Sequence, residues 1–149
     1  MCPAPAQAAQ SSTQRPIAPG TYLRTRRAAA GLSLHDVAAR ISTDPRLAET
    51  DRIAWLRMIE NGDAPVTADV ARALGRAFAF DPVVLGDLID IALTGAQAPP
   101  PRLCRLCACS ENDPCWDAAA QSACAWAATD LCTACAALAP APNQENGHA

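Results

Sequence analysis

The chain contains no lysine and few aromatic side chains, and both shortages narrow the choice of structure. All 12 of its basic residues are arginines and 15 residues are acidic, so the formal net charge is only −3. This balance excludes a polycationic protein. Three Trp, two Phe and one Tyr are the only aromatic residues among 149. A hydrophobic core must therefore be built mainly from Ala, Leu, Val and Ile, which favours helices.

A long apolar run and an export signal are missing as well. No segment approaches the roughly 18 apolar residues that a membrane-spanning helix requires. Residues 1–19 are rich in Pro, Ala, Gln and Ser and lack a basic start, so we expect a disordered leader rather than a signal peptide. We assign no role to Cys2 within it. A cytoplasmic location follows, and in that reducing compartment clustered cysteines indicate metal ligands rather than disulfides.

Composition divides the rest of the chain into four segments. Residues 20–93 show helical periodicity throughout, and residues 94–102 form a linker with three prolines. Residues 103–138 hold seven of the eight cysteines. Residues 139–149 are rich in Pro, Asn and Gln, and we expect them to be disordered. The sequence thus predicts a helical domain and a cysteine-rich module joined by a proline-rich linker.

Local stop and start signals predict the first two helices of residues 20–93. The first helix covers residues 21–30 and ends at Gly31, a residue type suited to the C-terminal end of a helix. Ser33 begins the second helix, and Asp36 stands three residues later, as in a capping box.

Three further helices follow a loop at residues 42–50. The third covers residues 51–60, Thr67 caps the fourth, and Asp81 caps the fifth. Apolar residues recur at helical spacing in the second to fifth helices and predict the side that faces the core. They are Leu34, Val37, Ala38, Ile41, Ile53, Leu56, Ile59, Val70, Ala71, Leu74, Phe78, Val84, Leu85, Leu88 and Ile89.

Four short motifs in order carry a family likeness. They read GLSLHDVA at residues 31–38, IENG at 59–62, VARALG at 70–75 and FDPVVL at 80–85. Over residues 20–88 this series resembles helix-turn-helix domains of the phage-repressor/Cro type. The resemblance implies that the third helix enters the major groove of DNA and that flanking helices touch phosphates.

The sequence departs from that family in two respects. The nine-residue connection at 42–50 is longer than the turn of about 3–4 residues in such motifs. The positions that usually reach base edges correspond to Ile53, Ala54 and Met58, and apolar side chains cannot make bidentate hydrogen bonds to bases. Between Arg24 and Arg57, however, seven arginines face four acids, which favours phosphate contact. The predicted DNA contacts are Arg40, Arg46, Arg52, Trp55, Arg57 and Met58.

The cysteines give the strongest signal in the chain. Two Cys-x2-Cys pairs, Cys104/Cys107 and Cys132/Cys135, enclose 24 residues. Each pair brings two thiolates to one ion, so the four sulfurs complete a tetrahedral site. We predict zinc, with an iron–sulfur cluster as the alternative. A module of this size buries too little apolar surface to fold without such support.

Three cysteines lie between the pairs: Cys109, Cys115 and Cys124. They predict a second metal site, which would need Asp113, Asp117, a water or a shared cysteine as its fourth ligand. The alternative is that they are buried free thiols. We expect the module's apolar residues to form a small core around the ion: Leu106, Trp116, Trp126 and Leu131. The pattern from Cys104 to Cys135 also resembles small cysteine-rich modules of phage and prophage proteins, generally of unassigned function, and it implies no activity.

Together these features predict an all-α protein: a five-helix repressor-like domain plus a small metal-stabilised module. The predicted function is a DNA-binding transcriptional regulator of phage or prophage origin, acting on double-stranded DNA. The competing hypothesis is an adaptor that keeps the helix-turn-helix fold and binds a protein. We expect no enzymatic activity, no membrane contact and no small-molecule substrate. A homodimer or a protein partner is compatible with both hypotheses.

Overall fold

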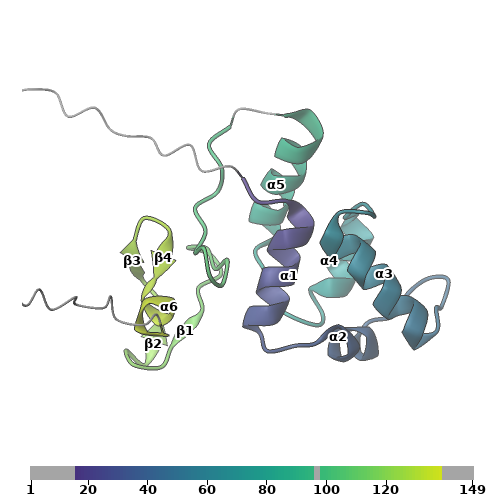
Figure 1. Cartoon of the computed structure of the whole chain (residues 1–149), viewed down its shortest axis with the longest axis horizontal. Coiled ribbons are helices and arrows are strands. Elements are labelled where there is room, and N and C mark those ends of the chain that lie inside the picture. The colour runs from purple at the N-terminus through teal and green to yellow at the C-terminus, as the bar shows by residue number, and fades with distance from the viewer. Residues whose placement is uncertain (1–15, 96–97, 139–149) are drawn as a thin grey trace, which may run out of the picture.

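A computed structural model describes residues 16–95 and 98–138 (Figure 1). The predicted leader and tail fall almost entirely outside these residues. The first part of the chain forms five helices: α1 (Pro19–Ala29), α2 (Leu34–Arg40), α3 (Glu49–Asn61), α4 (Ala68–Leu74) and α5 (Pro82–Thr94). Among the described residues, no helix has the length and apolar content needed to cross a membrane.

The helix ends follow the predicted local signals. The Ser33 side chain accepts a hydrogen bond from the Asp36 N–H while the Asp36 carboxylate accepts one from the Ser33 N–H, which confirms the capping box. The Asp81 carboxylate accepts from the backbone N–H groups of Val83 and Val84. Gly62 ends α3 with a φ of 81°, a conformation that costs glycine little.

The start of α3 differs from the prediction. The helix begins at Glu49 rather than at residue 51, which shortens the connection from α2. Ile53, Leu56 and Ile59 then face the core, as their spacing predicts. Ile53 is only 7% exposed, so its assignment to a base-reading position was wrong. The same side chain cannot fill the core and reach a base.

Helices α1 and α3 approach each other closely at the N-terminal end of α1. A Cβ atom on Gly20 would lie 2.3 Å from the Ile59 carbonyl oxygen and 2.7 Å from that of Glu60. The Arg27 guanidinium donates to both carboxylate oxygens of Glu60, at 2.6 and 2.8 Å. This largely buried pair joins the two helices in the fork geometry that favours arginine.

The cysteine-rich region contains strands, so the all-α prediction was wrong there. Strand β1 (Trp116–Asp117) pairs with β2 (Ser122–Ala123), and β3 (Trp126–Ala128) pairs with β4 (Leu131–Cys132), both antiparallel. Helix α6 (Thr133–Leu138) follows β4 directly. Strands of two or three residues are too short to show an alternating pattern of apolar and polar residues.

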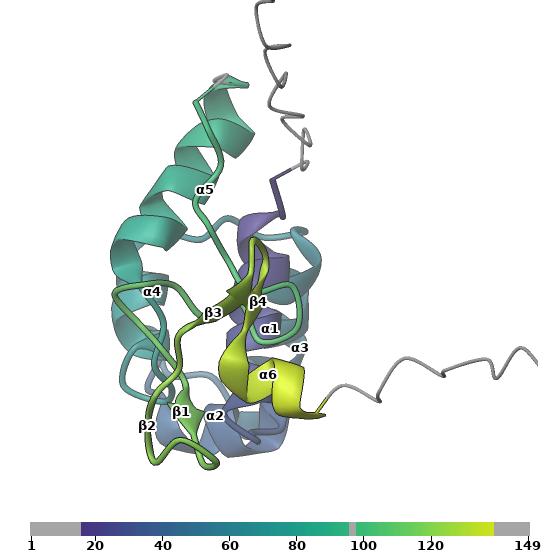
Figure 2. The same ribbon diagram turned by 90° about the vertical axis from the view of Figure 1, so that its left-hand side faces the viewer.

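The cysteine-rich region packs on α1, on the side away from α3 (Figures 1 and 2). Ala108 is 2% exposed and belongs to the same apolar core as the helices. Arg26 of α1 donates to the Cys107 carbonyl at 3.2 Å and to the Asp113 carboxylate at 2.6 Å. The Ser110 hydroxyl donates to the carboxylate of Asp81 at 2.8 Å. The two regions therefore share a core and a buried polar interface.

The predicted small core of the module is wrong in two of its members. Trp116 is 66% exposed and Leu106 is 54% exposed. Trp126 and Leu131 do pack in the module, but against cysteines. In the described part of the chain, the centre of the module consists of sulfur atoms rather than aromatic rings.

Candidate metal centre and nucleic-acid interface

Seven free cysteines gather in the cysteine-rich module. Two groups of four have all their sulfur atoms within 4.8 Å of one another. The first comprises Cys104, Cys107, Cys109 and Cys132, and the second Cys109, Cys115, Cys124 and Cys132. The four members of the first group are all buried. This cluster can hold a metal ion.

The spacing of the sulfur atoms matches tetrahedral metal coordination. Cys132 Sγ lies 3.8 Å from Cys107 Sγ and 3.6 Å from Cys115 Sγ, and Cys109 Sγ lies 3.7 Å from Cys124 Sγ. Neighbouring sulfurs around zinc, with Zn–S bonds of about 2.3 Å, are about 3.8 Å apart in a tetrahedron. All three separations are far longer than the S–S bond of about 2.05 Å in a disulfide.

Hydrogen bonds and burial shift the pKa values of four of the clustered thiols in opposite directions. The bond from the Cys109 thiol, with help from other donors, lowers the pKa of Cys107 to about 4. Burial alone would raise the pKa of Cys132, but bonds from the Cys135 N–H and from neighbouring thiols outweigh it and lower that pKa. Burial raises the pKa of Cys115 and Cys135. Of these four thiols, Cys107 and Cys132 are the two that the fold favours as thiolates, the form that binds metal.

Local backbone structure directs the first cysteines toward one point. The Cys104 N–H donates to the Cys109 carbonyl and the Ala108 N–H donates to the Cys104 carbonyl, at 3.1 and 2.8 Å. Ala108 adopts a φ of 55°, in the left-handed region that a residue with a Cβ rarely occupies. This tight turn places Cys104, Cys107 and Cys109 side by side.

The structure groups the predicted metal ligands differently from the two Cys-x2-Cys pairs of the sequence. Cys104, Cys107 and Cys132 lie together, but Cys109 is the fourth member of their group. Cys135 in α6 is half-buried, and its thiol bonds with those of Cys107 and Cys132. It is therefore adjacent to the group rather than outside the cluster.

The two acidic residues predicted as further ligands are engaged elsewhere. The Asp113 carboxylate is paired with Arg26. One oxygen of Asp117 accepts hydrogen bonds from the N–H groups of Ala119 and Ala120, at 3.0 and 3.1 Å. The second group of four is made of sulfur alone, without either carboxylate.

The outer surface of α3 is open, and the module does not cover it (Figure 1). Two carboxylates, Glu49 and Asp51, stand in its first turn. Met58 is 47% exposed, and Ala54 and Arg57 are exposed as well. This surface therefore offers one cation, two acids and a small apolar strip.

Arg52 binds the connection between α2 and α3. Its guanidinium donates to the Ala38 carbonyl at 2.8 Å and to the Leu47 carbonyl at 2.6 Å. The hydroxyl of Thr43 accepts from the Leu47 N–H at 2.9 Å. The longer connection is thus held against α3. Arg52 was predicted as a DNA contact, and the structure gives it a structural role in this loop.

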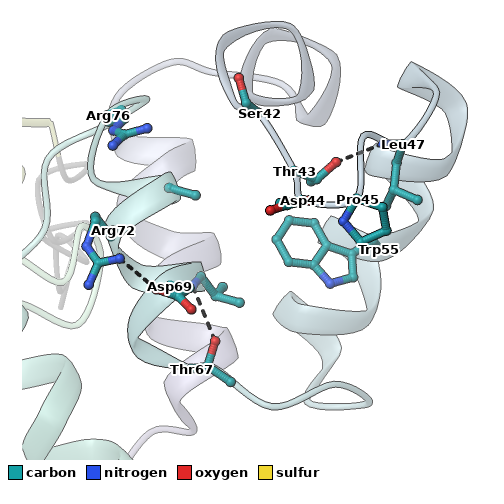
Figure 3. Close-up of a pocket in the computed structure, with 12 residues that line it drawn as sticks. Ser42, Thr43, Asp44, Pro45, Leu47, Trp55, Thr67, Asp69, Arg72 and Arg76 are labelled. Carbon is teal, nitrogen blue, oxygen red and sulfur yellow. Dashed lines mark hydrogen bonds and ion pairs between the residues drawn. The ribbon is translucent and has the colours of Figure 1, made fainter.

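Trp55 lines a pocket of about 650 Å³ between this loop and α4 (Figure 3). Its ring stands beside Pro45, and Arg72 and Arg76 lie across the opening. Arg72 pairs with Asp69 at 2.6 Å. The predicted DNA contacts did not include Arg72 and Arg76, which are exposed on α4 and directly after it.

The remaining predicted DNA contacts lie on the surface. Arg46, in the loop, and Arg57, on α3, are exposed and have no ion-pair partner among the described residues. Arg40, also exposed, donates to the Ala77 carbonyl at 3.3 Å. Together with Arg76, these side chains place positive charge at the end of α2, in the loop, on α3 and after α4.

Helices α2 and α3 follow each other in the chain and pack together, an arrangement similar to the bihelical unit of helix-turn-helix domains. Residues 20–88 match a family model described as a helix-turn-helix domain. No curated protein and no solved structure matches the chain.

Proposed function

We propose that the protein is a DNA-binding transcriptional regulator in which α3 approaches the major groove and nearby arginines contact phosphates. The observation that carries this proposal is the helix-turn-helix domain at residues 20–88, whose α3 has an uncovered outer surface. In such domains the second helix of the unit docks in the major groove. A cytoplasmic location, a phage or prophage origin and the absence of enzymatic activity are parts of the same proposal.

The charge distribution supports a binding mode dominated by the DNA backbone. Arg46 and Arg57 carry charges that no carboxylate of the described residues neutralises. Ala54 and Met58 can offer only apolar contact to thymine methyl groups. Glu49 and Asp51 oppose close approach of phosphates at the start of α3. We therefore expect most of the affinity to come from phosphate contacts.

We further propose that the cysteine cluster holds zinc in a structural role. Four-thiolate sites are closed to substrate and stabilise small folds. The module needs this support because its centre is made of sulfur. Elemental analysis of protein purified without added metal tests the assignment. Zinc supports it, whereas iron together with visible absorption would identify an iron–sulfur cluster.

Single arginine variants test the DNA interface. Arg57→Ala should weaken binding to a random duplex and reduce the slope of log affinity against log salt by about 1. Arg105→Ala is the matched control, since it removes the same charge from the module, where Arg105 pairs with Asp130 at 3.0 Å. Fluorescence anisotropy titrations measure both variants. Equal affinities and slopes for wild type and Arg57→Ala would contradict the proposed interface.

An adaptor function is the second candidate, and the two acids with the apolar strip on α3 favour it. A protein partner would contact Ala54 and Met58 in place of the grooves of DNA. Its binding would tolerate salt and would be lost on Met58→Ala. Absence of DNA binding at low salt, with a salt-tolerant protein complex, would favour the adaptor.

A further inference from the structure

The two groups of four thiols share two sulfurs, those of Cys109 and Cys132, and together contain six of the seven clustered thiols. The seventh thiol, that of Cys135, is in hydrogen-bonding contact with Cys107 and Cys132. The sulfur of Cys132 lies 3.8 Å from that of Cys107 and 3.6 Å from that of Cys115. Both separations are close to the edge of a thiolate tetrahedron around zinc, about 3.8 Å. The Cys132 sulfur therefore stands at tetrahedral distance from a thiol of each group, Cys107 in the first and Cys115 in the second.

We propose that the module binds two ions, of zinc or of a metal with the same tetrahedral thiolate coordination, in one seven-thiolate centre and that the Cys132 sulfur bridges them. This inference rests on the proposed metal binding and extends it to a second ion and a shared ligand. The first ion takes Cys104, Cys107 and Cys135 with the bridge: Cys135, in contact with Cys107 and Cys132, stands in place of Cys109. Cys109 goes to the second ion, because its sulfur lies 3.7 Å from that of Cys124. The second takes Cys109, Cys115 and Cys124 with the same bridge.

The number of sulfurs requires one shared ligand. Two tetrahedral ions have eight ligand positions, and the described cluster supplies seven thiols. A carboxylate does not complete the set, because Asp113 is paired with Arg26 and Asp117 caps the backbone of Ala119 and Ala120. One bridging thiolate accounts for all eight positions.

The second set has all four sulfurs within 4.8 Å of one another, and two opposite edges have tetrahedral length. Cys109 and Cys124 form one edge of 3.7 Å, and Cys115 and Cys132 form the opposite edge of 3.6 Å. The Cys124 N–H donates to the Cys115 carbonyl at 2.8 Å and holds their two segments together. These contacts give the second ion four sulfur ligands from four segments of the module.

The position of Cys132 suits a bridge. Its side chain is 1% exposed, so water does not compete for its lone pairs. It ends β4, next to α6, and the chain continues from there to Cys135. Its thiol is in hydrogen-bonding contact with those of Cys107 and Cys135 and also with that of Cys115.

Cadmium-113 NMR of the full chain tests the bridge directly. The protein is loaded with ¹¹³Cd²⁺ under reducing, oxygen-free conditions. Elemental analysis should give two ions per chain, and the spectrum should show two thiolate-type resonances with mutual ¹¹³Cd–¹¹³Cd coupling through the shared sulfur. One ion per chain, or two resonances without coupling, would overturn the bridged centre.

Two serine variants make the test residue-specific. Cys124→Ser should reduce the content from two ions to one and leave the first resonance without coupling, because Cys132 then serves one ion only. Cys2→Ser, which alters the cysteine outside residues 103–138, should keep both ions. Retention of two coupled ions in Cys124→Ser would overturn the ligand assignment. Failure to bind any metal would contradict the proposed zinc site itself, whereas a single uncoupled ion would contradict only the bridge.

Discussion

Arg26 of α1 and Asp113 of the cysteine-rich module, 87 residues apart in the chain, form an ion pair of 2.6 Å. The Arg26 side chain is 7% exposed and that of Asp113 is 19% exposed. Arg26 also donates to the Cys107 carbonyl. One guanidinium thus joins the helical domain to the turn that carries the first cysteines.

Removing Asp113 should therefore destabilise the whole protein. Asp113→Ala leaves the buried charge of Arg26 without its carboxylate, which costs on the order of 3 kcal/mol. Asp130→Ala is the control, because its pair with Arg105 is exposed and contributes less than about 1 kcal/mol. Urea unfolding of both variants measures the difference. Equal losses in the free energy of unfolding would show that the Arg26–Asp113 pair stabilises the fold no more than an exposed ion pair does.

Metal removal should lower the stability of the helical domain as well as that of the module. Ala108 lies in the helical core and Ser110 bonds to Asp81, which caps α5. A strong chelator should therefore lower the thermal midpoint of the helical circular-dichroism signal, and added zinc should restore it. A helical transition that stays unchanged after complete metal removal would mean that the two regions are energetically independent.

Gly20 is expected to resist any side chain. In Gly20→Ala the new Cβ would overlap the Ile59 and Glu60 carbonyls, and we expect a loss of about 1–3 kcal/mol. Gly86→Ala, in α5, meets nothing within 4 Å and should stabilise the protein by up to about 1 kcal/mol. Thermal unfolding compares the two. If both variants shift the unfolding midpoint in the same direction, the result would contradict the close approach of Gly20 in α1 to the carbonyls of α3.

Tyr22, the only tyrosine in the chain, should titrate late. It is fully buried and accepts a hydrogen bond from the Asp81 N–H, and burial raises its pKa from 10.0 to about 12. The folded protein keeps this proton where the unfolded chain loses it. Tyr22 therefore contributes stability below pH 10 that is lost as pH rises toward 12.

Absorbance at the tyrosinate wavelength follows this titration without interference from a second tyrosine. The midpoint should lie near pH 12 in the folded protein and near 10 in denaturant. A native midpoint near 10 would show that the ring is accessible to water. Tyr22→Phe should abolish the signal and remove the acceptor for the Asp81 N–H, at a cost of about 1–3 kcal/mol.

The helical part of the fold was predictable because its signals are local. Ser33 with Asp36, and Asp81 with Pro82, stand within a few residues of the helix ends they determine. The spacing of Ile53, Leu56 and Ile59 fixed the inward side of α3 in the same way. The gathering of the cysteines followed from their number and spacing.

Contacts between distant segments were not predictable in this way. Nothing in the spacing of Arg26 and Asp113 indicates that they meet. Trp126 packs beneath Arg102, whose guanidinium carbon lies 4.0 Å from the ring centroid, while Trp116 stays exposed. Whether Trp116 or Trp126 is covered depends on how the strands of the module pack around the cysteine cluster. The role of Arg52 was missed because it depends on where the loop after α2 returns to α3.

The most direct test of the central claim is the affinity of the metal-loaded protein for duplex DNA across a salt series. We predict binding at low salt whose log affinity falls linearly with log salt, as expected when arginines displace counterions from phosphates. Binding that is absent at low salt, or that does not change with salt, would contradict a DNA-binding function for the helix-turn-helix domain.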